Sequence, residues 1–98
     1  MTKQLDPLKL EKVAIILKAA AHPLRLGIID LLDKNERLSV NDICDQLKSD
    51  QSLTSHHLKN MRLNGLLKCE REGQQMFYSL LLKEVTEIIR CLEKCDKL

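Results

Sequence analysis

Small polar and basic side chains gather in residues 49–65, the part of the sequence whose chemistry best suits a partner. This segment reads SDQSLTSHHLKNMRLNG. Ser49 or Asp50 can cap the start of a helix, and Asn64-Gly65 can adopt the left-handed conformation that ends one. Hydroxyl and amide groups read base edges in the DNA major groove, and helix-end amides and cations hold phosphates. The segment therefore predicts a helix whose front end enters the major groove, with a solvated helix face as the alternative.

Apolar spacing divides this predicted helix into two sides. Thr54, Leu58 and Met61 recur at i, i+4 and i+7, which places them on one stripe against a core. The other faces carry polar and basic side chains, namely Gln51, Ser52, Ser55, His56 and Lys59. We therefore expect one side of the helix to pack and the other to face a partner.

Cysteine is the second residue type that could do chemistry. The four cysteines lack the paired CxxC spacing of a zinc ribbon, and with no secretion signal they are expected to be reduced. Cys91 and Cys95 are four residues apart, so their thiols would project from one side of a helix. This pair is a candidate site for a metal, a metalloid or thiol oxidation, with plain packing as the alternative. Cys44 and Cys69 are interpreted as packing residues.

Four further segments have the apolar spacing of amphipathic helices and would position the helix predicted within residues 49–65. They are residues 8–21, 24–33, 40–47 after a cap at Ser39, and 83–96. His22-Pro23 separates the first two, and His22 is expected to cap the break rather than to serve a site. Residues 39–64 then contain two short helices joined by a tight turn, which is the helix-turn-helix pattern.

After Gly65 the period changes from helical to alternating. Residues 66–71 and 75–81 predict two strands around Glu72-Gly73-Gln74, a hairpin with Arg71 and Gln74 or Gln75 at its tip. Such a wing can reach phosphates or the minor groove, and a plain structural hairpin is the alternative. The fold class is therefore mainly α with a small β-hairpin (α+β), a winged helix-turn-helix over residues 1–98 as one domain.

Charge and composition narrow the classes of function. The formal net charge is only +2, too weak to identify a nucleic-acid partner by itself. Residues 51–75 nevertheless have four Lys or Arg against two Glu, a surplus of two, whereas residues 23–50 have four against six acids, a deficit of two. No apolar run of membrane-spanning length and no signal segment occur, so we expect a cytoplasmic chain without a membrane partner. No phosphate loop or nucleophile motif indicates an enzyme.

The first and last predicted helices, about residues 8–21 and 83–96, offer more apolar surface than one small domain needs. A chain of 98 residues buries only about two-thirds of its unfolded surface, so a second subunit would help. We therefore expect a homodimer through these two helices, with two recognition helices about one DNA turn apart on a palindromic site.

Three segments in this order resemble the ArsR/SmtB family of winged-helix repressors. They are the AHPxRL segment at residues 21–26, the SxxSHHLKxL pattern at residues 52–61 with Met61 in the last position, and RxGxxxxYxL at residues 71–80. The resemblance implies a homodimer that binds operator DNA and releases it when a metal, metalloid or oxidant is sensed. It places Gln51, Ser52, Ser55 and His56 on bases and expects His57 to pack or hydrogen-bond locally.

The effector sites of that family are not matched. Where some members carry a CxC-type thiolate pair, this chain has Ser39 and Asn41, and its final helix contains no histidine for a zinc site. Asp30 stands at the second-helix position of the oxidant sensors, so only a later thiol, Cys91 or Cys95, has a counterpart. The effector is therefore not identified.

A sequence-specific DNA-binding transcriptional regulator, an ArsR-type repressor acting on double-stranded operator DNA, is the leading hypothesis. The alternative is a winged-helix module that binds another protein and touches DNA weakly or never. The predicted DNA-contacting residues are Gln51, Ser52, Thr54, Ser55, His56, Lys59, Arg71, Gln74 and Gln75.

Overall fold

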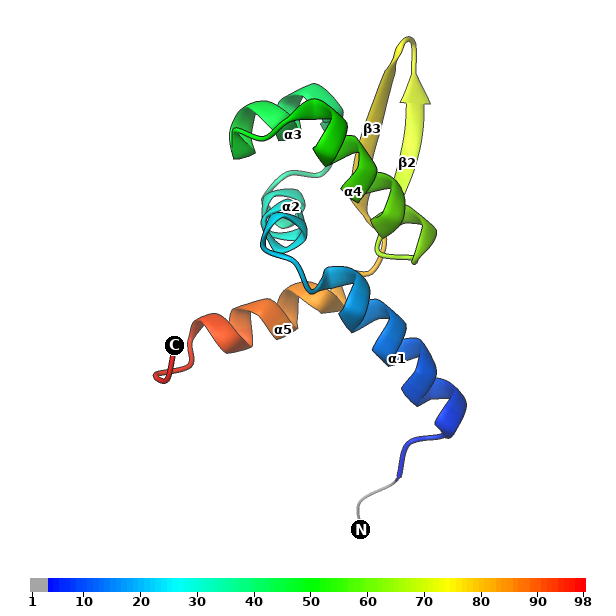
Figure 1. Ribbon diagram of the computed structural model, residues 1–98, viewed down its shortest axis with the longest axis vertical. Helices are drawn as coiled ribbons and strands as arrows, with labels where there is room; N and C mark the ends of the chain where they lie inside the picture. The colour runs from blue at the N-terminus through cyan, green and yellow to red at the C-terminus, as the bar shows by residue number, and fades with distance from the viewer. Residues whose placement is uncertain (1–3) are drawn as a thin grey trace.

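Five helices and three short strands make up the part of the chain that the computed structural model describes, residues 4–98. In chain order they are α1 (Pro7–Ala20), α2 (Pro23–Lys34), β1 (Leu38–Ser39), α3 (Val40–Leu47), α4 (Gln51–Leu63), β2 (Leu67–Glu72), β3 (Gln75–Leu80) and α5 (Glu84–Glu93). The molecule is elongated, with extents of 52 × 32 × 22 Å. Figure 1 shows α3, α4 and the hairpin of β2 and β3 at one end, while α1 and α5 diverge at the other.

The first four helices begin where side chains cap them. Each cap residue accepts a hydrogen bond of 2.9–3.2 Å from a backbone N–H in the first turn, which satisfies one of the donors that a helix start leaves open. The cap residues are Asp6, His22, Ser39 and Asp50. The predicted roles of Ser39 and His22 as caps are confirmed, and Asp50 rather than Ser49 caps α4.

The three strands form one antiparallel sheet in the order β1-β3-β2. Glu72 pairs with Gln75, so β2 and β3 are joined by the two-residue turn Gly73-Gln74, in which Gly73 has a φ of 66°. This hairpin, residues 67–80, is the wing, and its prediction is confirmed. Strand β1 was not predicted, because its two residues are too few to show a period.

The core lies where α2, α3 and α4 meet the inner face of the sheet. The three helices, strand β2 and the segment before β2 all supply fully buried apolar side chains. These are Ile28, Ile29, Ile43, Leu58, Met61, Leu66 and Leu67. Burial of each such side chain contributes roughly 1.5–3 kcal/mol to folding. The central elements therefore hold one another in place without a second chain.

Helices α1 and α5, the arms, are attached differently. In α1 only Ala19 and Ala20 of the last turn are buried, and in α5 only Val85 and Thr86 of the first. Helix α5 ends at Glu93 rather than at the predicted residue 96. Arg90 still pairs with Asp33 of α2, but every side chain after it is exposed, and helices this short depend on packing. Among residues 4–98, no helix is long and apolar enough to span a membrane.

Candidate nucleic-acid interface

The turn between α3 and α4 fixes the recognition helix against its partner. Lys48 ends α3 in the left-handed conformation, with a φ of 50°, and its N–H donates to the carbonyl of Cys44. The hydroxyls of Ser49 and Thr54 then lie 2.6 Å apart. This hydrogen bond joins the turn to the first turns of α4, so the front of α4 has a defined direction.

The polar side of α4 is exposed, as the sequence predicted. Gln51, Ser52, His56 and Lys59 are open to solvent, and Ser55 is half-buried beside them. We call these five residues the outer face of α4. With two hydroxyls, an amide, an imidazole and an ammonium group, the outer face can donate to and accept from base edges and hold a phosphate.

Thr54 corrects the predicted list of DNA-contacting residues. Its side chain is fully buried, and its hydroxyl is engaged with Ser49. It therefore supports the turn and cannot reach DNA. The sequence carried the signal for this position, since Thr54 shares the i, i+4, i+7 stripe of Leu58 and Met61.

The wing tip lies at the same end of the molecule as the front of α4 (Figure 1). A shallow pocket of about 200 Å³ is lined by Gln51 and Ser55 of α4, Gln74 and Gln75 of the wing, and Asn41 of α3, among others. The structure thus brings predicted residues from two segments together and adds Asn41. From the sequence, Asn41 was considered only as the counterpart of a metal ligand, although it is a polar residue near the start of a predicted helix.

Two arginines shape the wing and its charge. Arg37, before β1, makes an ion pair of 2.5 Å with Glu72 and stacks on the Phe77 ring at 4.4 Å from its centroid. Arg71 is exposed near the tip, and its Nε donates to the carbonyl of Gly73 at 3.3 Å. Arg37 therefore links the segment before β1 to both strands of the wing, while Arg71 offers a cation at the flank of the interface.

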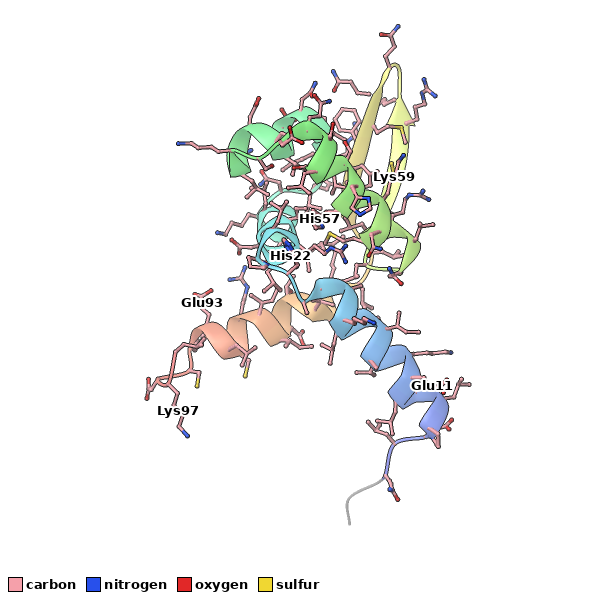
Figure 2. The ribbon with its side chains drawn as sticks, in the orientation of Figure 1. Glu11, His22, His57, Lys59, Glu93 and Lys97 are labelled. Carbon is pink, nitrogen blue, oxygen red and sulfur yellow. The ribbon has the colours of Figure 1, made fainter. Side chains whose placement is uncertain are left out.

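The inner side of α4 is joined to α2 by a polar cluster. Arg25 donates from Nε to Nδ1 of His57 at 2.9 Å and from Nη1 to Oδ1 of Asn60 at 2.8 Å. The ring centroids of His57 and His22 lie 4.5 Å apart, side by side in Figure 2. Burial lowers the pKa of His57 below its ordinary 6.5, and the charges of Arg25, His22 and His56 lower it further. The prediction that His57 hydrogen-bonds locally is confirmed.

Comparison with known proteins identifies this arrangement. The model of the bacterial regulatory protein arsR family matches residues 22–68, from the start of α2 into the wing. The transcriptional repressor PagR of Bacillus anthracis is 39% identical over 89 residues, which cover 91% of this chain and 89% of PagR. The chain belongs to the ArsR family. The resemblance seen in the sequence is therefore confirmed.

Solved structures of ArsR-type regulators share the fold. The crystal structure of PagR matches with a TM-score of 0.80, at 40% identity, over 89% of this chain and 99% of that chain. HlyU from Vibrio cholerae, named a transcriptional activator, matches with a TM-score of 0.81, at 33% identity, over 95% of this chain and all of that chain (100%).

A homodimeric winged helix-turn-helix DNA-binding domain from Mycobacterium bovis, a possible ArsR-family regulator, matches with a TM-score of 0.78. It is 27% identical, over 95% of this chain and 87% of that chain. The winged helix-turn-helix fold predicted here is confirmed, and this ArsR-family chain is a DNA-binding transcriptional regulator. The family and the named relatives are transcriptional regulators.

The two C-terminal cysteines of this ArsR-family chain do not form the predicted pair on one helix. Cys91 is exposed on α5, but Cys95 is exposed in the turn beyond the end of that helix. In residues 4–98, no group of three or more His, Cys, Asp or Glu side chains is placed to hold a metal ion. Cys44 and Cys69 are half-buried, consistent with packing.

Proposed function

We propose that this chain is a sequence-specific transcriptional repressor that binds a palindromic operator duplex as a homodimer. The observation that carries the proposal is the convergence of the outer face of α4 and the wing-tip amides on one exposed surface. A repressor role is supported by PagR, which is named a transcriptional repressor. Occupation of a promoter by such a dimer would exclude the polymerase.

The front of α4 and its later turns have different roles in this proposal. Gln51, Ser52, Ser55 and His56 read base edges, because their amide, hydroxyl and imidazole groups are exposed at the helix start. Lys59, one turn further, holds a phosphate. Base contacts then give discrimination, while phosphate contacts give most of the affinity.

The wing completes each half-site. Arg71 contacts a phosphate at the flank, and Gln74 and Gln75 approach the backbone beside the groove that Gln51 occupies. Asn41, which lines the same pocket, extends this surface onto α3. Each subunit would thus hold the duplex at two places.

Dimerisation uses the arms in this proposal. An apolar groove of about 480 Å³ separates α1 from α5 and is lined by Leu17, Leu26, Val85, Ile88 and Leu92, among others. Further apolar side chains remain exposed along α1, including Leu8, Leu10 and Val13. A second copy covers these faces, as the homodimeric relative from Mycobacterium bovis supports.

The C-terminal thiols are the proposed effector site. Cys91 and Cys95 are both exposed, so a soft metal ion or metalloid would reach them more readily than the half-buried Cys44 and Cys69. In a dimer that pairs the two α5 helices, thiols of both subunits could bind one ion. Arsenite should then release DNA from the wild type but not from Cys91→Ser/Cys95→Ser, and equal release from both would exclude this site.

The DNA-binding proposal is tested with a duplex from the region upstream of the protein's own gene and a random duplex of equal length. Wild type should prefer the upstream duplex, and affinity should fall steeply with added salt. Ser55→Ala/His56→Ala should remove the preference, because it deletes two base-reading groups. Lys59→Gln, the matched control, should weaken binding to both duplexes alike. Discrimination that survives the double substitution would contradict the assignment of the outer face.

A further inference from the structure

The junction of α1 with the rest of the molecule contains a polar connection that DNA reading and dimerisation do not explain by themselves. Within α1 only Ala19 and Ala20 are buried, so few apolar contacts fix the angle of this helix. Directly after it, Pro23 occupies the position whose N–H would bond the carbonyl of Ala19 in a continuing helix, and proline has no N–H. Arg25 supplies that donor, with Nη1 2.9 Å from the Ala19 carbonyl oxygen.

The same guanidinium also holds the inner side of α4. Its Nη1 donates to Oδ1 of Asn60 and its Nε donates to Nδ1 of His57, at 2.8 and 2.9 Å. His57 and Asn60 are three residues apart, so both face Arg25 from one side of α4. One half-buried side chain therefore joins the last turn of α1, the first turn of α2 and the middle of α4.

All three acceptors of Arg25 are uncharged, and only one of them, the imidazole of His57, can gain a proton and a positive charge. Nδ1 of His57 accepts the Nε proton only while that nitrogen carries no proton of its own. Protonation would set an imidazolium against a guanidinium across 2.9 Å, donor facing donor. The other groups that face His57 are His22, at 4.5 Å between ring centroids, and His56, at 5.9 Å, and neither can compensate a positive charge. Burial and these neighbours hold the pKa of His57 below its ordinary value.

The angle between α1 and α4 matters because the proposed dimer pairs through α1 while α4 reads the DNA. In a two-fold dimer, a rotation of α4 relative to α1 moves both recognition helices and changes their separation. A palindromic site demands a fixed separation of about one DNA turn, whereas non-specific phosphate binding does not. Loss of this connection should therefore reduce discrimination more than total affinity.

We propose that Arg25 is a positioning residue that holds the recognition helix α4 at a fixed angle to α1, and that it does so only while His57 is neutral. This proposal rests on the proposed function as a dimeric reader of a palindromic site. Acidification would release α4 from Arg25 and make the regulator less selective, independently of any bound effector.

The experiment uses a duplex that the wild type selects from a random-sequence pool, together with a scrambled duplex of equal length. The measured quantity is the ratio of the two dissociation constants, because a ratio cancels the general effect of added positive charge on DNA affinity. Between about pH 8 and about pH 5, this ratio should fall about tenfold in the wild type, as for loss of one hydrogen bond to a charged group. Far-UV circular dichroism at both ends of the range shows that the protein stays folded.

Substitution of each of the three histidines in turn identifies the responsible group. His57→Asn keeps an uncharged acceptor near the Nδ1 position and cannot titrate, so its ratio should stay constant with pH. His22→Asn keeps a capping side chain and should retain the pH-dependent fall. His56→Asn alters the outer face of α4, yet the pH dependence of its ratio should persist.

Arg25→Lys tests the positioning role without loss of charge. An ammonium group cannot reach three acceptors with the fixed fork of a guanidinium, so the ratio at about pH 8 should fall about tenfold while binding to the scrambled duplex is unchanged. An unaltered ratio in Arg25→Lys, or an equal pH dependence in His57→Asn and wild type, would overturn the inference. Failure of wild type to discriminate at any pH would instead overturn the proposed function. If Arg25→Lys does not fold, the comparison of wild type with His57→Asn decides.

Discussion

The central elements and the arms of this molecule use apolar residues in opposite ways. In the centre, Ile28, Ile43 and Leu58 are fully buried among their own chain's elements. Along the arms, Leu10 and Leu92 also belong to apolar stripes of helical period, but they remain 49% and 57% exposed. Apolar helical stripes are thus buried by their own chain in the centre and remain exposed along the arms.

This difference separates the features that a single chain completes by itself from those that would need a second chain. The centre positions α4 and the wing, so each copy of the chain carries the full set of proposed DNA-reading groups. The arms carry little of that chemistry, and Figure 2 shows Glu11 along the outer part of α1, with Glu93 and Lys97 near the free end of α5. In the proposed dimer, the free apolar faces of the arms would select the partner chain and set the distance between the two DNA-reading surfaces.

The largest expected effect contrasts two leucines of the two regions. Leu58→Ala should lower the free energy of unfolding by about 2–5 kcal/mol, because it opens a cavity in the centre. Leu92→Ala is the matched control on α5. Because Leu92 is exposed in a single chain, this substitution should lower the free energy of unfolding only to the extent that the protein is dimeric. Urea titrations at two protein concentrations check both expectations, and equal, concentration-independent losses would abolish the distinction between the regions.

A charge placed on an arm should break assembly while sparing the centre. Ile88→Asp puts a carboxylate into the groove between α1 and α5, which should cost dimerisation about 2–3 kcal/mol. Sedimentation velocity at micromolar concentration should then show monomers with unchanged helix content. Glu87→Gln, on the exposed side of the same helix, should stay dimeric. A monomeric wild type would remove the proposed role of the arms.

Much of the centre could be predicted because its signals are local. Caps at Ser39 and His22, the Gly73 turn and the apolar stripe of α4 each depend on residues a few positions apart, and all were predicted. The connection of Arg25 to His57 spans 32 positions, and β1 exists only because Leu38 meets Tyr78, so neither leaves a local pattern. Thr54 was misplaced because a hydroxyl was given more weight than its spacing.

A smaller effect should appear in the pH dependence of stability. The pKa of His57 is lowered in the folded protein, so the unfolded chain binds its proton more readily. Stability from neutral His57 is therefore complete above the ordinary pKa of 6.5 and is lost as pH falls through the lower, folded value. Thermal unfolding of wild type should show this loss, and His57→Asn should flatten it. A steeper curve for the variant would contradict the assignment.

The smallest expected change concerns the turn that precedes α4. Lys48 has a φ of 50°, a conformation that costs most side chains about 1 kcal/mol, so Lys48→Gly should stabilise the centre by up to about 1 kcal/mol. Gln46→Gly, two residues earlier inside α3, should destabilise it by about 1 kcal/mol. Chemical denaturation distinguishes the two, and the same sign for both would show that the backbone angle is not the cause.

The exposed apolar faces of the arms also bear on how a cell would use such a regulator. Assembly of two chains is a second-order process, so the concentration of a dimeric reader rises with the square of the monomer concentration while monomers predominate. A twofold change in synthesis would then become a fourfold change in the species that occupies DNA. Repression by this chain would have a threshold set by the affinity of α1 and α5 for their counterparts, before any effector acts.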